Sequence, residues 1–197
     1  MPAYIKGSGR IVRLVVSLAL PFGAGALGGW ATSQGVGDWY LTLAKPSFNP
    51  PSWVFGPAWT LLYILMGLAF FLVWDKGATD PEGRRGEGPA GARGGGLVGA
   101  HGERPGGARY DALLGVRGAM ALFGVQLALN SLWSFLFFWA QAPGWAFAEI
   151  LLLWVAIAGT MVLFFRQRRL AGWLMTPYLG WVTFAAVLNY SIWTLNT

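Results

Sequence analysis

A chain of 197 residues in which 55% of side chains are hydrophobic and only 11% are charged cannot cover a globular surface with polar groups, since soluble domains carry about 25% charged residues. The absence of cysteine excludes disulfide bonds, thiol catalysis and cysteine-bound metal. The net charge of +6 invites a nucleic-acid-binding interpretation, but the positions of the charges, described below, argue against it.

The first apolar segment, residues 11–31, follows a short basic tail at residues 1–10. Its start resembles a signal peptide, with Ala24 and Ala26 as a cleavage site, but the apolar stretch continues beyond them. A membrane span needs about 20 apolar residues, and this segment meets that length, so we expect an uncleaved helix. A turn-rich stretch with several prolines and glycines then leads to a second apolar segment, residues 53–74.

The segment at residues 77–109 is dense in Gly, Pro, Arg and Glu and almost free of apolar residues. It cannot bury enough apolar surface to offset its loss of conformational entropy, so the composition predicts a disordered loop. Three more apolar segments follow, at residues 112–139, 145–165 and 170–195. Because an isolated apolar segment in lipid must satisfy its own backbone hydrogen bonds, all five should be helices. The sequence therefore predicts an all-α membrane protein whose transmembrane domain, residues 11–197, is a five-transmembrane-helix bundle.

The positive charges are divided unequally between the two sides of such a bundle. All but one of the fourteen Lys and Arg residues lie in or beside the N-terminal tail, the 77–109 segment and the turn at residues 166–169. Lys45 is the exception. By the positive-inside rule this pattern predicts a cytoplasmic N-terminus, as in a bacterial inner membrane. The basicity is thus a topology signal, and we expect no nucleic-acid partner.

Catalytic and metal-binding groups are scarce. His101 lies in the predicted loop without a partner, and there is no metal-binding motif or phosphate-binding loop, so the sequence predicts no metal site. Glu149 is the only acidic residue inside a predicted helix. A carboxyl group within a membrane is a functional candidate by default, whereas one about a turn from the interface costs little and can be structural. Both interpretations stay open.

Polar and aromatic residues recur at helical spacing. Gln126, Asn130 and Trp133 follow one another at i, i+4 and i+7, so they share one helix face. The same spacing relates further residues of the second and last segments: Trp59 with Tyr63, and Tyr178 with Trp181, Ala185 and Asn189. Flat indole faces beside amide groups suit a flat, largely apolar ligand. Hydrogen bonding and packing between helices would explain the same pattern.

Four blocks of sequence occur in a specific order. They are WY at residues 39–40, KPSFNPPSWVFGPAWTLLYILMG at 45–67, QLALNSLW at 126–133 and PYLGWVTFAAVLNYSIW at 177–193. Their order and spacing resemble the translocator protein family, also called tryptophan-rich sensory proteins. The resemblance implies a five-helix bundle, usually a homodimer in the membrane lipid, with a pocket capped by the first loop. The segment at 77–109 departs from the family, which keeps this connection short.

The resemblance also implies a function. Family members are membrane receptors for porphyrins such as protoporphyrin IX and haem, and for related flat apolar ligands, in tetrapyrrole sensing, homeostasis or trafficking. Porphyrin would be the ligand here, and no obligatory cofactor is expected. The positions that match the family's pocket are Trp39, Tyr40, Pro50, Trp53, Trp59, Tyr63, Gln126, Asn130, Trp181, Ala185 and Asn189.

The family leaves two other activities open. Some members degrade protoporphyrin in light and oxygen, which would make Trp59 and Trp181 candidate catalytic residues, since an indole beside an excited porphyrin is an oxidisable electron donor. Others translocate lipids or sterols, but the sterol pattern needs a basic residue soon after its tyrosine, and none follows Tyr190. The family also occupies bacterial and mitochondrial outer membranes, so these remain alternatives to the inner membrane.

Overall fold

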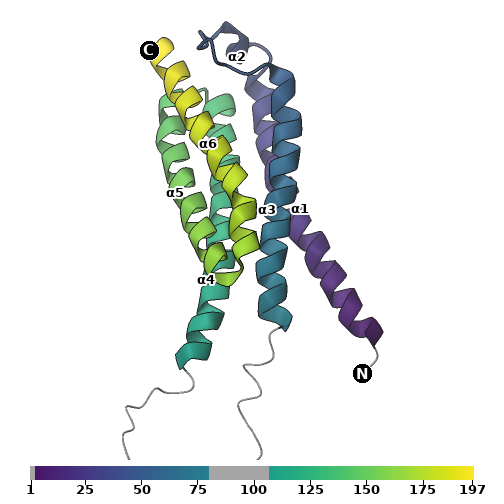
Figure 1. Ribbon diagram of the computed structural model, residues 1–197. Coiled ribbons are helices and arrows are strands. Elements are labelled where there is room, and N and C mark those ends of the chain that lie inside the picture. Colours follow the sequence, from purple (N-terminus) through teal and green to yellow (C-terminus); the bar gives the residue numbers. More distant parts are fainter. Residues whose placement is uncertain (1–2, 80–106) are drawn as a thin grey trace, which may run out of the picture.

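The computed structural model describes residues 3–79 and 107–197, and these residues form helices and their connections, without a strand (Figure 1). The long helices are α1 (Ala3–Gly35), α3 (Phe55–Thr79), α4 (Gly107–Ser134), α5 (Pro143–Gln167) and α6 (Arg169–Leu195). Three short elements complete the described parts: α2 (Trp39–Thr42), the 3-10 turn η1 (Ser52–Val54) and the π-helical turn η3 (Phe135–Trp139). Each of the five long helices contains a stretch long and apolar enough to cross a membrane, which confirms the predicted bundle.

Several helices are longer than the apolar segments that predicted them. An apolar segment marks the part of a helix that lies in hydrocarbon, whereas the helix itself continues for further polar turns. The difference is largest around the predicted 77–109 loop, because α3 continues to Thr79 and α4 begins at Gly107. Both edges of that segment are therefore helical, and the predicted disorder of its interior concerns residues 80–106, outside the described ranges.

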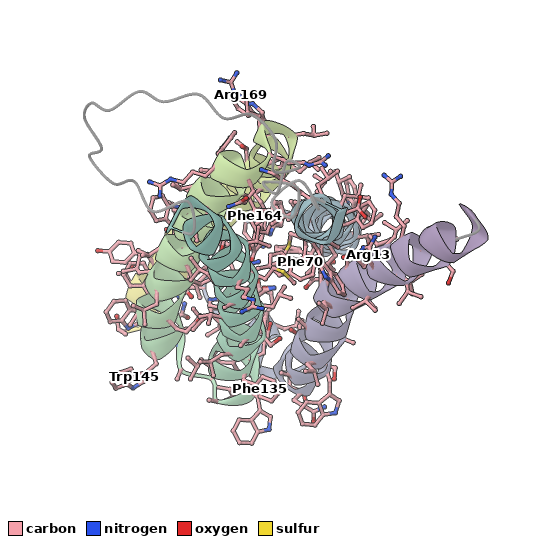
Figure 2. All side chains as sticks on the ribbon, turned by 90° about the horizontal axis from the view of Figure 1, so that it is seen from below. Arg13, Phe70, Phe135, Trp145, Phe164 and Arg169 are labelled. Atoms are coloured by element: carbon pink, nitrogen blue, oxygen red, sulfur yellow. The ribbon has the colours of Figure 1, made fainter. Side chains whose placement is uncertain are left out.

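The five long helices form a closed ring in the order α1, α3, α6, α5, α4, so that α4 packs against α1 again. Figure 2 views this arrangement from below, the end at which α1 begins. The ring order differs from the chain order because the helix after α3 crosses to the other side of the bundle, which leaves α6 to pack against α3. Residues distant in sequence therefore face one common interior.

Helix α1 bends near its middle, and its N-terminal half tilts away from α3 (Figure 1). Pro21 lies inside this helix and has no N–H group to donate to the carbonyl of Ser17, which is the usual cause of such a bend. At this level Gly67 of α3 touches α1: a Cβ atom on Gly67 would lie 2.9 Å from the Ser17 carbonyl oxygen. The missing side chain lets the two helices meet at the bend.

The half of the bundle below the bend is tightly packed. Phe123 of α4 stacks on Phe70 of α3 and on Phe164 of α5, with ring centroids 4.6 and 5.8 Å apart, and Figure 2 labels the last two side chains. Near the same end the buried carboxylate of Asp75 accepts a hydrogen bond of 2.9 Å from the Arg13 guanidinium. This packing closes the lower half and leaves the upper half to hold a cavity.

Candidate functional site

The upper half of the bundle encloses a cavity of about 440 Å³. All five long helices contribute to its wall, and the loop between α1 and α3 contributes Tyr40, Asn49 and Pro50 at its mouth. Most of the lining is apolar, with a few polar side chains among aromatic rings. A concave site of this size and character is typical of pockets for small organic molecules, whose volumes are about 300–1,000 Å³.

Two tryptophans form an aromatic corner of the wall. Trp59 of α3 and Trp181 of α6 lie with their ring centroids 6.4 Å apart and their planes at 78°. Tyr63, one turn along α3, stacks on Trp59 at 5.3 Å, and Phe55 meets Trp181 edge-on at 5.9 Å. These contacts hold the two indoles in place, and all four rings line the cavity, so aromatic surface is available to a flat molecule there.

The polar groups of the wall bond across helices. The Trp133 indole donates a hydrogen bond of 2.9 Å to the Asn189 side-chain oxygen, and the Asn189 amide donates one of 2.8 Å to the Pro143 carbonyl. The Tyr63 hydroxyl is hydrogen-bonded to the Asn130 side chain. Pocket lining and helix-to-helix bonding, the two interpretations that the spacing left open, therefore hold together for Asn130 and Asn189.

Helix α1 contributes almost bare backbone to the wall. Gly25, Gly28 and Gly29 line the cavity. A Cβ atom on Gly25 would collide with the Tyr63 ring, and one on Gly28 would lie 3.0 Å from the Ser134 hydroxyl oxygen. The glycines thus let α1 approach α3 and α4 while they leave space inside the bundle.

The loop over the cavity, residues 36–54, forms a lid that is tied to the end of α6. The Ala44 N–H group donates to the Asn196 side-chain oxygen, and the Asn196 amide donates to the Ala44 carbonyl, each over 2.9 Å. Within the lid, the Tyr40 hydroxyl donates to the Asn49 side-chain oxygen over 3.2 Å. Burial raises the pKa of Tyr40 above its ordinary value, and the hydrogen bond with Asn49 opposes this. The Tyr40 hydroxyl therefore remains a donor at neutral pH.

Eight of the eleven residues singled out in the sequence lie on the cavity wall: Tyr40, Pro50, Trp59, Tyr63, Asn130, Trp181, Ala185 and Asn189. The other three do not line it. Trp39 packs its ring against Phe137 at 5.8 Å, and Trp53, in the 3-10 turn, is 74% exposed. Gln126 is fully buried one turn of α4 below Asn130, and its amide has no hydrogen-bond partner among the described residues. Whether any of the eleven contacts a ligand stays a prediction.

Two parts of the wall were not predicted from the sequence. Phe137 and Phe138 line the cavity from the π-helical turn η3, whose wider winding no residue spacing indicates. The glycines of α1 were also missed, although the GAGALGG run at residues 23–29 was a signal for close approach. Glu149 is buried away from the wall, and both its carboxyl oxygens lack a hydrogen-bond partner within the described ranges.

The model of the TspO/MBR family matches residues 17–194, which include most of α1, the whole lid and all the residues of the cavity wall. The chain belongs to the TspO/MBR family. Relatives of similar length support the assignment. The tryptophan-rich protein TspO of Archaeoglobus fulgidus is 34% identical over 187 residues, which cover 95% of this chain and 99% of that protein.

Two further members of the TspO/MBR family match over a shorter range. The translocator protein of Homo sapiens is 35% identical over 158 residues, 80% of this chain and 75% of that protein. The tryptophan-rich sensory protein of Cereibacter sphaeroides is 34% identical over 159 residues, 81% of this chain and 77% of that protein. Membership of this family and the five apolar helices establish an integral multi-pass membrane protein.

Proposed function

We propose that this TspO/MBR protein is a membrane receptor for porphyrins, and that the cavity under the lid holds the flat macrocycle. In this role it would act in tetrapyrrole sensing, homeostasis or trafficking. The single observation that carries the proposal is the aromatic corner: Trp59 and Trp181, 6.4 Å apart, both line an enclosed and mostly apolar cavity. A planar aromatic ligand can stack on the faces of these indole rings.

The polar chemistry of the wall supports a ligand with an apolar body. Asn189 already uses its side-chain oxygen and amide in bonds to Trp133 and Pro143. Asn130 is engaged by Tyr63. A ligand in the interior would therefore find few free polar partners, and a buried polar group without a partner is costly. A large aromatic macrocycle with its polar substituents at the rim satisfies this condition.

A porphyrin titration tests the proposal. Purified protein in detergent is titrated with protoporphyrin IX, and binding is followed by the absorbance of the porphyrin, so that removal of tryptophans does not change the readout. We expect saturable binding by the wild-type protein. The double variant Trp59→Leu with Trp181→Leu should bind about tenfold more weakly, because it loses two aromatic contacts worth about 0.5–1.5 kcal/mol each. Trp145→Leu, at a side chain that is 74% exposed, is the matched control. Unsaturable binding, or equal affinity in all variants, would overturn the proposal.

A second candidate activity is the breakdown of porphyrin in light and oxygen. The position of Trp59 and Trp181 favours it, because two oxidisable indoles would lie beside the bound macrocycle. Illumination of the aerobic complex would then convert the porphyrin to products with altered absorbance, and the double variant would lose this conversion. Recovery of unchanged porphyrin after illumination excludes the activity and leaves binding intact.

The membrane orientation and assembly are part of the proposal. We propose a cytoplasmic N-terminus, from the charge distribution along the chain, and a homodimer, from the family. A reporter enzyme fused after Thr197 should be active only outside the cytoplasm of a bacterial host.

The homodimer is tested by the mass of the purified protein. Light scattering should give twice the mass of one chain after correction for detergent. Cytoplasmic reporter activity or a single-chain mass contradicts the corresponding statement.

A further inference from the structure

Lys45 lies in the lid next to a residue of the cavity lining, although it does not line the cavity itself. Its Nζ atom lies 4.5 Å from the centroid of the Tyr40 ring and donates a hydrogen bond of 3.3 Å to the Leu43 carbonyl. Tyr40 is itself part of the cavity lining. The ammonium is therefore held on the lid by an aromatic face and a carbonyl, two interactions that orient a cation without neutralising it.

The backbone around Lys45 is well fixed. The preceding residue, Ala44, exchanges two hydrogen bonds with Asn196, the residue that follows α6. The following residue is Pro46, whose ring restricts residue 45 to extended conformations. Lys45 thus projects from a defined point of the lid, and its position relative to the mouth is set by α6 as well as by the lid.

No carboxylate neutralises this lysine within the described ranges. The ion pairs found there both involve Asp75, near the opposite end of the bundle. The other Lys and Arg side chains that the structure describes lie in that opposite half: Arg10, Arg13, Lys76, Arg117, Arg166, Arg168 and Arg169. The positive-inside pattern therefore accounts for them and leaves Lys45 unexplained.

We propose that Lys45 selects ligands that carry a carboxylate and orients them with that group at the mouth of the cavity. This inference rests on the proposed function and adds to it a direction of binding. None of the side chains that line the cavity is charged, so an ionised carboxylate in the deeper part would lack a cationic partner. At the mouth, the Lys45 ammonium supplies the missing charge, while the macrocycle reaches the aromatic corner of Trp59 and Trp181.

A lipid phosphate at the membrane surface could offer the same ammonium an anionic partner. The two sources are separated by a pair of porphyrins that differ only in charge. Protoporphyrin IX carries two carboxylates, and its dimethyl ester carries none. Binding of both is measured in dodecyl maltoside, a detergent without phosphate, and in phosphatidylcholine nanodiscs.

The variants are Lys45→Met, which keeps the length of the side chain but removes its charge, and Lys45→Arg, which keeps the charge. Arg169→Met, an exposed side chain at the opposite end of the bundle, is the control. We expect Lys45→Met to lower the affinity for protoporphyrin IX about tenfold in both media and to change the affinity for the dimethyl ester by less than about twofold. Lys45→Arg and Arg169→Met should leave both affinities within about threefold.

Three outcomes would overturn the inference. In the first, Lys45→Met weakens the binding of both porphyrins equally, which assigns the lysine to the structure of the lid. In the second, it changes the binding of neither. An effect confined to nanodiscs would assign the lysine to lipid phosphate. All three leave the proposed porphyrin binding intact, whereas wild-type protein that binds neither porphyrin contradicts the proposed function itself and the inference with it.

Discussion

The Trp133 indole of α4 donates a hydrogen bond to the Asn189 side-chain oxygen of α6 over 2.9 Å, and the Asn189 amide donates to the carbonyl of Pro143, the first residue of α5, over 2.8 Å. A single side chain thus joins three helices beside the cavity. Asn189 is almost completely buried, and its two partners are partly buried between the helices. This bridge makes Asn189 a determinant of the cavity's shape as well as a part of its lining.

Asn189→Ala should therefore lower the free energy of unfolding by about 1–3 kcal/mol, because it removes two side-chain hydrogen bonds between helices and leaves the Trp133 indole N–H group without its acceptor. Ser191→Ala is the matched control, since Ser191 is exposed and donates only to the Val187 carbonyl of its own helix. Its effect should stay within about 0.5 kcal/mol. Thermal unfolding in detergent measures both. Equal effects of the two substitutions would show that the bridge contributes nothing specific.

The bare backbone of α1 leads to a second prediction. Gly25→Ala places a methyl group into the Tyr63 ring, so Tyr63 must leave its stack on Trp59, and overpacking of this kind costs about 1–3 kcal/mol. Gly23→Ala lies in the same helix with nothing near the added methyl group, and it should stabilise by up to about 1 kcal/mol through helix propensity. Unfolding measurements on the pair should give opposite signs. Stabilisation by both would disprove the close approach at Gly25.

Removal of the lid's connection to α6 should speed the release of a ligand. Asn196→Ala removes both hydrogen bonds to Ala44, each worth about 0.5–1.5 kcal/mol. We expect the dissociation rate of protoporphyrin IX to rise about tenfold, measured by stopped-flow transfer to an excess of apomyoglobin. Thr197→Ala, one residue further along the chain, should leave the rate unchanged. An unaltered rate in Asn196→Ala would mean that the lid does not limit release.

The lid should also respond to alkaline pH. Burial raises the pKa of Tyr40 in the closed lid, so the open lid loses the Tyr40 proton first as the pH rises past about 10. Stability of the closed lid is therefore fully present below that pH and falls above it. Ligand release should be constant from about pH 6 to 9 and faster above about pH 10. Tyr40→Phe should flatten this alkaline rise while it leaves Lys45 in place, and an identical rise in the variant would assign the effect to another group.

The five helices were predictable because a long run of apolar residues is visible in the sequence. Such a run in hydrocarbon must be helical to satisfy its own backbone hydrogen bonds. The polar turns that extend a helix beyond the apolar run have no such signal, so Thr79 and Gly107 were assigned to a loop. The ring order of the helices was not predictable either. It depends on contacts such as the one between Gly67 and Ser17, which need both helices in place.

The site was predicted where residues share one helix face. Trp59 with Tyr63, and Trp181 with Ala185, line the cavity together because a spacing of four residues preserves direction along a helix. The same rule does not give depth along the helix: Gln126 shares a face with Asn130 but lies one turn below it and does not line the cavity. Trp53, which the family resemblance assigned to the pocket, lies off the wall because it precedes α3 in a 3-10 turn and is mostly exposed.

The central claim is that a flat ligand occupies the space between the helices, and a cavity-filling substitution tests it most directly. Ala185 lines the cavity on α6, whereas Val187, two residues along, is 53% exposed on the outer face. Ala185→Phe fills space that the macrocycle needs, and Val187→Phe adds an aromatic ring outside the bundle. The measurement is a protoporphyrin IX titration of both folded variants. We predict loss of saturable binding in Ala185→Phe and wild-type affinity in Val187→Phe; unchanged affinity in Ala185→Phe would contradict the account.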